Sequence, residues 1–171
     1  LRALMRGVEY YIIDPEDEYA RICQAVGGQY IRLSGSSAHH INPFDLGSGS
    51  PRDGEAQDAL TERLLALQGL FGLMLADKGS SLTQRERGAL DRALLETYGR
   101  AGITRAPSTH GRPAPVLRDL YDVLREEGDQ LGLADRLERF VDGSLGEIFS
   151  SPTSVDLHRP FVVFNIRDLE P

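Results

Sequence analysis

A chain of 171 residues fits one ordinary domain, with room for an inserted subdomain, and is long enough to bury a hydrophobic core. Its 40% hydrophobic and 26% charged residues are typical of a soluble globular protein. The net charge of −7 gives no support for a surface that binds nucleic-acid phosphates, so DNA is not an indicated partner. The single cysteine, Cys23, excludes an internal disulfide framework, and no apolar stretch approaches the roughly 20 residues of a membrane span.

The first part of the chain predicts a strand, a helix and a second strand. Residues 8–13 are β-branched and aromatic without polar alternation, which is typical of a strand covered on both faces of a sheet. Apolar residues at helical spacing follow over 15–26 and end at a Gly-Gly pair. A second strand is expected over 29–33.

Residues 34–54 are rich in Ser, Gly, Pro and Asn, which indicates a loop. The motif INPFDL at 41–46 interrupts it. Asn42 precedes a proline and is therefore biased toward extended backbone, and we expect Phe44 to anchor the loop to the core. The motif suggests a structural rather than a chemical role.

The middle of the chain is helical by its apolar spacing for nearly a hundred residues. Thr83 and Glu86 form a capping-box signature at the start of one helix, and Pro115 is expected to open another. The predicted helices lie at about 60–74, 83–98, 115–124 and 133–142.

The segment PFVVFNIRDL, residues 160–169, returns to an unbroken apolar run and predicts a buried strand. The order of elements favours an α/β fold in which a helical insertion interrupts a sheet. We therefore expect a strand-helix-strand segment over 1–52, a helical insertion over 53–150 and a returning core strand over 151–171.

Four carboxylates follow the first predicted strand: Asp14, Glu16, Asp17 and Glu18. In open parallel sheets, ligands bind beyond the carboxyl ends of the strands. Asp14 before a proline is also a good helix N-cap, and acids in a first turn complement the helix dipole. Capping acids and catalytic acids occupy the same edge, so spacing alone leaves both roles open.

Three motifs then occur in order: IIDPEDEYARICQAVGGQYIRLS, INPFDL and, after the helical insert, VVFNIRDL. Together they resemble the ATPase domain of type IV secretion and conjugation systems, in the VirB-class and TraC-like branch of the FtsK–HerA group of RecA-like motors. The resemblance implies a partial RecA-like parallel sheet with an inserted all-α subdomain. It also implies ATP and Mg²⁺ as cofactors of the parent protein, a ring hexamer, other secretion-system components as partners, and a location at the cytoplasmic face of the bacterial inner membrane.

The resemblance also implies roles for individual acids. Glu18 matches a glutamate that helps to activate the attacking water, and Asp14 matches an aspartate at the strand end that caps or orients. Glu16 falls where relatives vary between acid and base, so its supporting role is weaker. Asp17 departs from the usual glycine, and an extra acid there would repel phosphate or alter the turn.

The sequence contains no phosphate-binding loop of the form G-x-x-x-x-G-K-[ST] and no Walker B Asp-Glu strand. The only lysine, Lys78, lies in a helix-breaking turn without the leading glycine. We therefore expect an interior fragment of the motor that binds no ATP or other cofactor and is inactive alone. The alternatives are a non-catalytic helical interaction module on a small α/β scaffold, whose acids are only caps, and an unrelated α/β nucleotide-binding protein.

Two further pairs of residues suggest other sites. His39 and His40 are adjacent, so they point opposite ways on an extended segment, and no third ligand lies at metal spacing. No metal site is therefore expected. Arg167 and Asp168 follow the last strand and fall on the ligand edge of the sheet. They form either a mutual or capping ion pair, or a nucleotide-sensing or intersubunit site.

Overall fold

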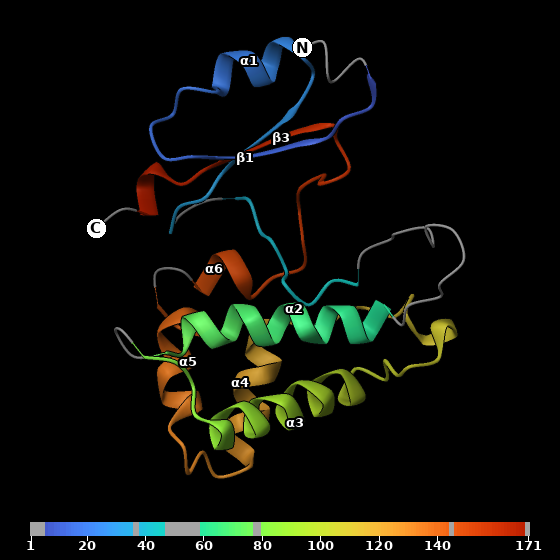
Figure 1. Ribbon diagram of the computed structural model, residues 1–171, viewed down its shortest axis with the longest axis vertical. Coiled ribbons are helices and arrows are strands. Elements are labelled where there is room, and N and C mark those ends of the chain that lie inside the picture. Colours follow the sequence, from blue (N-terminus) through green and yellow to red (C-terminus); the bar gives the residue numbers. More distant parts are fainter. Residues whose placement is uncertain (1–5, 36–37, 47–58, 77–79, 144–145, 170–171) are drawn as a thin grey trace.

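The computed structural model describes residues 6–35, 38–46, 59–76, 80–143 and 146–169. A three-stranded sheet carries helix α1 (Ala20–Ala25) on one face, and helices α2 to α6 gather on the opposite side (Figure 1). Lys78 and the part of the predicted loop from 47 to 54 lie outside the described residues.

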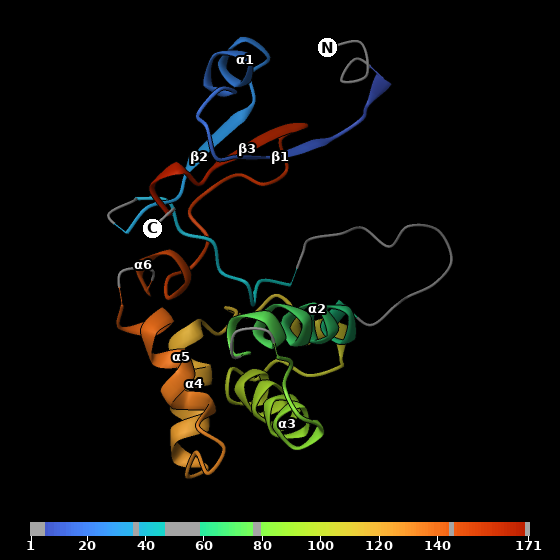
Figure 2. The same cartoon turned by 60° about the vertical axis from the view of Figure 1, so that its left-hand side comes forward.

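The sheet is parallel and has the order β1-β3-β2, with β3 in the centre (Figure 2). Its strands are β1 (Tyr10–Asp14), β2 (Gln29–Arg32) and β3 (Phe161–Asn165). The chain therefore leaves the sheet after β2, forms the helices and returns between the first two strands. This confirms the predicted α/β class, and the strand predicted from the apolar run at 160–169 is present as β3.

The prediction that the first strand is covered on both faces is wrong for β1. The side chains of β3 are buried apart from partly buried Phe164, whereas Tyr11 and Ile13 of β1 are 55% and 70% exposed. The reason is position, because β1 is an edge strand of the described sheet. Helix α1 covers only the face from which Tyr10 and Ile12 point.

Helix α1 begins later than the predicted residue 15, because residues 14–19 form a turn before it. The helix ends at a Gly-Gly pair, as predicted. Gly27 has a left-handed φ of 68°, and a Cβ at Gly28 would lie only 2.6 Å from the carbonyl oxygen of Phe161. Both positions therefore require glycine to bring the chain directly into β2.

The helical block comprises five helices within the described residues. The capping box at Thr83 is confirmed, since Thr83 Oγ1 accepts from the backbone N–H of Glu86 and the Glu86 carboxylate accepts from the N–H of Thr83. The helix expected at Pro115 begins two residues later, and α6 was not predicted. The helices are α2 (Ala59–Met74), α3 (Gln84–Arg100), α4 (Leu117–Glu126), α5 (Leu133–Val141) and α6 (Gly146–Phe149).

The INPFDL loop ties the sheet to this block. Phe44 is completely buried and contacts the rings of Phe71 and Tyr98, at centroid distances of 5.8 and 5.9 Å. The hydroxyl of Tyr98 donates to the carbonyl of Phe44 at 2.7 Å. The buried amide of Asn42 donates to the carbonyl of Pro115 at 2.9 Å, so the anchoring role predicted for this motif is confirmed.

The segments that enter and leave the helical block run side by side. The N–H of His40 donates to the hydroxyl of Ser154 at 2.9 Å, and the N–H of Ser154 donates back to the carbonyl of His40 at 3.1 Å. The N–H of Asn42 donates to the hydroxyl of Thr153 at 2.8 Å. These contacts hold the two connecting segments together as a paired stem between the sheet and the helical block.

Candidate functional site at the carboxyl edge of the sheet

The carboxyl ends of the three strands meet in register. Asp14 of β1 and Arg32 of β2 both lie opposite Asn165 of β3. Asp14 and Asn165 are only 1% and 2% exposed, which is unusual for polar side chains unless they are hydrogen-bonded. The sheet edge that was predicted to carry the ligand site therefore contains buried polar side chains, and these are hydrogen-bonded within the protein.

Asp14 uses both carboxylate oxygens on the turn that follows β1. Its Oδ1 accepts from the backbone N–H of Glu18 at 3.1 Å, and its Oδ2 accepts from the N–H of Tyr19 at 3.0 Å. Asp14 is not the N-cap of α1, because the helix begins at Ala20 with Tyr19 as its N-cap and has no side-chain capping bond and no acid in its first turn. The helix-capping and dipole roles considered for these acids are therefore wrong. The contact of Asp14 is with the turn before the helix. The same contact fixes the backbone on which the Glu18 side chain is mounted.

Asp17 lies in the left-handed region, with φ of 62°. Glycine adopts this conformation without strain, while aspartate and asparagine tolerate it better than other residues. The aspartate that replaces the usual glycine of the resembling family therefore keeps the turn that a glycine would make. In the described structure its carboxylate accepts a hydrogen bond from the hydroxyl of Tyr30.

Tyr30 links this turn to the centre of the sheet. Its oxygen also accepts from the side-chain amide of Asn165 at 2.7 Å. Burial, followed by the hydrogen bond to Asp17, raises the pKa of Tyr30 to about 12. The hydroxyl therefore stays protonated and keeps donating to Asp17 at any physiological pH.

Glu16 and Glu18 are both exposed on the turn. An exposed carboxylate on a fixed backbone can accept a proton from a water molecule or orient it. The structure thus brings Glu18, Asp14 and Glu16 together within one turn, as their spacing requires. It divides them into one buried anchor and two accessible acids.

Asp168 lies in a short 3-10 helix after β3, Arg167–Leu169, and pairs with Arg32 of β2 at 2.7 Å. The hydrogen bond from Arg32 lowers the pKa of Asp168. The ion pair of Asp168 is thus with Arg32, and the charge of Arg167 lowers the pKa of Asp168 as a smaller contribution. Arg167 is exposed, and its backbone N–H donates to the side chain of Asn165 at 3.2 Å.

Tyr30, Arg32 and Asn165 were missed from the sequence. The available signal was their place at or near the ends of predicted strands, where side chains of parallel strands converge. His39 also lies at this edge, where its Nδ1 accepts from the N–H of Arg32 at 3.1 Å. Among the described residues, no three His, Cys, Asp or Glu side chains form a group that could hold a metal ion.

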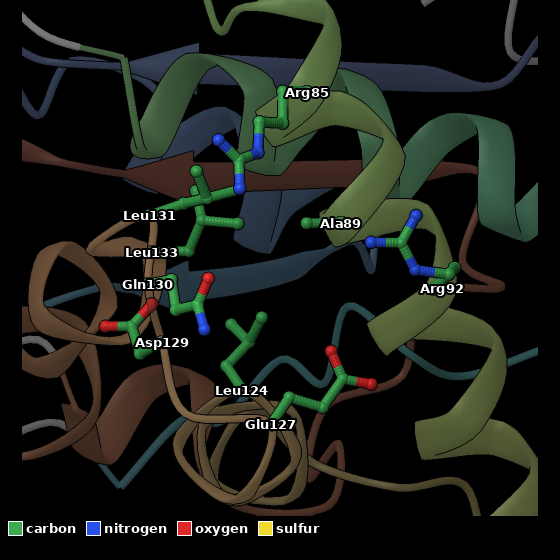
Figure 3. A pocket seen from close by; sticks show the side chains of 9 residues that line it. All are labelled: Arg85, Ala89, Arg92, Leu124, Glu127, Asp129, Gln130, Leu131 and Leu133. Atoms are coloured by element: carbon green, nitrogen blue, oxygen red, sulfur yellow. The ribbon is translucent and has the colours of Figure 1, made fainter.

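A separate cleft of about 230 Å³ opens in the helical block, between α3 and the turn after α4 (Figure 3). Arg85 and Arg92 of α3 face Glu127 and Asp129 across an apolar floor. The carboxylate of Asp129 accepts from the N–H of Asp135 and so caps α5. The cleft contains none of the acids predicted to be catalytic, and we place the candidate site at the sheet edge.

Within the described part of the chain, no helix combines the length and apolar character needed to cross a membrane.

Comparisons with known proteins place the chain in a wider context. No protein-family model matches it, and a search of curated proteins found no match. The structure of VirB4 of Thermoanaerobacter pseudethanolicus does match, with a TM-score of 0.78 and 31% sequence identity. The alignment covers 99% of this chain and 44% of the VirB4 chain, so our chain spans less than half of its relative. In fold and in sequence the chain is therefore VirB4-like over nearly its whole length, as its three motifs predicted.

Proposed function

We propose that this chain is part of an ATP-hydrolysing motor of a type IV secretion or conjugation system. The observation that carries the proposal is the match to VirB4 at 31% identity over 99% of the chain. The three motifs that carry the resemblance form the sheet edge and its anchoring loop, which supports placing the site at this edge.

In this proposal Glu18 orients or deprotonates the water that attacks the γ-phosphate. Its exposure supports this role, since a catalytic carboxylate must reach solvent and substrate. Asp14 holds the turn through the N–H groups of Glu18 and Tyr19, which makes it a positioning residue. Glu16 is exposed on the same turn and has a weaker, supporting role.

The reaction requires ATP and Mg²⁺, which stabilise and orient the transferred phosphoryl group when bound. Among the described residues, no three His, Cys, Asp or Glu side chains form a group that could hold a metal ion without other ligands. Mg²⁺ at such sites is usually bound by one or two protein ligands together with the phosphates and water. We propose that other parts of the full-length protein bind the phosphates and the ion. The chain by itself is then inactive and binds no ATP.

We further propose that residues 1–52 and 151–171 form one unit of the motor, with 53–150 as an insertion. The paired stem at His40 and Ser154 supports this division, because both connections to the helices leave the sheet together. The full-length protein would form a ring hexamer with other secretion-system components at the cytoplasmic face of the inner membrane. Arg167, which is exposed beside the carboxyl edge, and the neighbouring Asp168 are the residues we assign to a nucleotide or subunit contact.

The proposal is tested by Glu18→Gln in the full-length protein. The amide keeps the size of the side chain but cannot take a proton. ATP binding should be retained while turnover falls about a hundred-fold or more, as expected for loss of a general base. Glu9→Gln is the matched control, since it makes the same change on an exposed acid at the other end of β1. Wild-type turnover in Glu18→Gln would contradict the proposal.

The alternative is a non-catalytic interaction module, in which the acids only stabilise the turn. The charged cleft between α3 and the turn after α4 is the observation that favours it. Under this alternative Glu18→Gln would leave every activity of the full-length protein unchanged.

A further inference from the structure

A chain of hydrogen bonds connects the turn that carries Glu18 to the two other strands. The side-chain amide of Asn165, at the end of β3, donates to the oxygen of Tyr30 on β2 at 2.7 Å. The hydroxyl of Tyr30 in turn donates to the carboxylate of Asp17. With the two bonds from Asp14, the turn is held from all three strands of the described sheet.

The ring and the hydroxyl of Tyr30 have separate roles. The ring packs at the edge of the small cluster formed by Cys23, Phe161 and Val163 under α1. A phenylalanine would make the same packing contacts. The hydroxyl is what reaches across the strand ends to the turn, so it can be removed without removing the packing.

The backbone of Asp17 gives an independent reason to look for a role. A non-glycine residue in the left-handed region is strained, although aspartate less than most, and a glycine would avoid this strain. The aspartate carboxylate takes the hydrogen bond from Tyr30, which glycine cannot do. Strain of this kind persists when the side chain supplies a contact that the site needs.

We propose that Tyr30 is a positioning residue for the water-activating Glu18, acting through Asp17 with Asn165 as its support. The inference rests on the proposed function, because it assigns a task to the turn that carries Glu18. Asp14 fixes the C-terminal half of the turn by binding the N–H groups of Glu18 and Tyr19. Tyr30 fixes the preceding residue, so that the direction of the Glu18 side chain is set from both sides.

The raised pKa of Tyr30 supports a permanent donor. Burial is the larger cause and the hydrogen bond to Asp17 the next, and the resulting value of about 12 keeps the hydroxyl protonated. The contact to Asp17 therefore does not switch off within the pH range in which ATP turnover is measured.

The test uses steady-state ATP hydrolysis and thermal unfolding of the full-length protein. Tyr30→Phe should lower kcat about ten-fold, since small misplacements of a catalytic group have effects of this size or larger. KM for ATP should stay within about two-fold, because the change affects the reacting geometry rather than substrate binding. Tyr11→Phe is the matched control, since its hydroxyl donates to the carbonyl of Leu157 at 3.1 Å and makes no contact with the turn.

Variants of Asp17 separate positioning from stability. Asp17→Asn retains an acceptor for the Tyr30 hydroxyl and should keep kcat near that of the wild type. Asp17→Gly relieves the backbone strain but removes the hydrogen bond from Tyr30, so these two effects on Tm oppose each other and Tm should change little. The value of kcat should nevertheless fall as in Tyr30→Phe, because the contact to the turn is lost. The double variant Tyr30→Phe/Asp17→Gly should be no worse than either single variant, because both remove the same contact.

The outcomes distinguish this inference from the function on which it rests. Normal turnover in Glu18→Gln would overturn the proposed function itself. Loss of turnover in Glu18→Gln with a normal kcat in Tyr30→Phe would overturn only the positioning role. The positioning role would also be overturned if kcat fell only in those Tyr30 and Asp17 variants whose Tm also fell, because this indicates general destabilisation. An equal loss of kcat in Tyr11→Phe would overturn it for the same reason.

Discussion

Asp14 offers the sharpest test of how the carboxyl edge is built. It is 1% exposed and accepts from two backbone N–H groups, so Asp14→Ala removes both bonds at once. A helix cap usually contributes about 1 kcal/mol. Hydrogen bonds to a charged acceptor contribute about 1.5–3 kcal/mol each, although the two N–H groups lie on an exposed turn and regain water.

The loss of the two bonds is partly offset because the freed N–H groups bind water. We therefore expect Asp14→Ala to lower the free energy of unfolding by about 2–3 kcal/mol. For a chain of this length, that corresponds to a fall in Tm of about 4–12 °C. Asp14→Asn keeps one carbonyl acceptor and should lose about half as much. The assay is urea unfolding followed by far-UV circular dichroism, with thermal melts of the same variants.

The matched control is Asp45→Ala. Within the described residues, the Asp45 carboxylate accepts one hydrogen bond, from the side-chain amide of Asn42 at 3.2 Å, so its loss should cost less than that of Asp14. A loss of 1 kcal/mol or less in Asp14→Ala, on the scale of an ordinary cap, would refute the reasoning. It would mean that the two bonds do not act as a buried, charge-assisted pair.

Two further predictions concern the helical block. The hydrogen bonds of Thr83 to the Glu86 carboxylate, and then that of Arg136, lower the pKa of Glu86 from 4.5 to about 2. Because the folded pKa is depressed, the stabilisation by Glu86 is fully present above about pH 4.5 and is lost as the pH falls toward 2. Urea unfolding at a series of acidic pH values should therefore show a smaller loss of stability in Glu86→Gln than in the wild type, and an identical loss would contradict this. Phe44→Ala should lower the free energy of unfolding by about 3–5 kcal/mol, because it empties a fully buried site against Phe71; a change below about 1 kcal/mol in urea unfolding would show that the loop anchors nothing.

Local patterns predicted the elements of this fold well. The capping box at Thr83 and the Gly-Gly stop after α1 depend on residues a few positions apart, so the sequence displays them directly. The anchoring by Phe44 was also predictable, since an aromatic residue in a polar loop has few other uses. The open face of β1 was not predictable, because a run of apolar residues does not state whether its strand lies at the centre or the edge of a sheet.

The contacts at the carboxyl edge were beyond prediction for a related reason. Tyr30 and Asn165 are far apart in the sequence, and only the register of β2 against β3 brings them together. The same register brings Arg32 to Asp168, a partner that the sequence did not indicate. Spacing placed Glu18 and Asp14 on one turn, but it could not show that only one of them is buried.

The order β1-β3-β2 also has a consequence for how the chain folds. Within the described sheet, β1 and β2 do not pair with each other, so neither gains a ladder of hydrogen bonds until β3 arrives. The helical block lies between them in the sequence and consists of local contacts, which form faster than long-range strand pairing. On a ribosome the helices can therefore fold while β1 and β2 wait for β3 to be synthesised. During this interval β1 and β2 remain open to incorrect pairing with other chains, so a stall in synthesis just before β3 would be more hazardous for this fold than one inside the helical block.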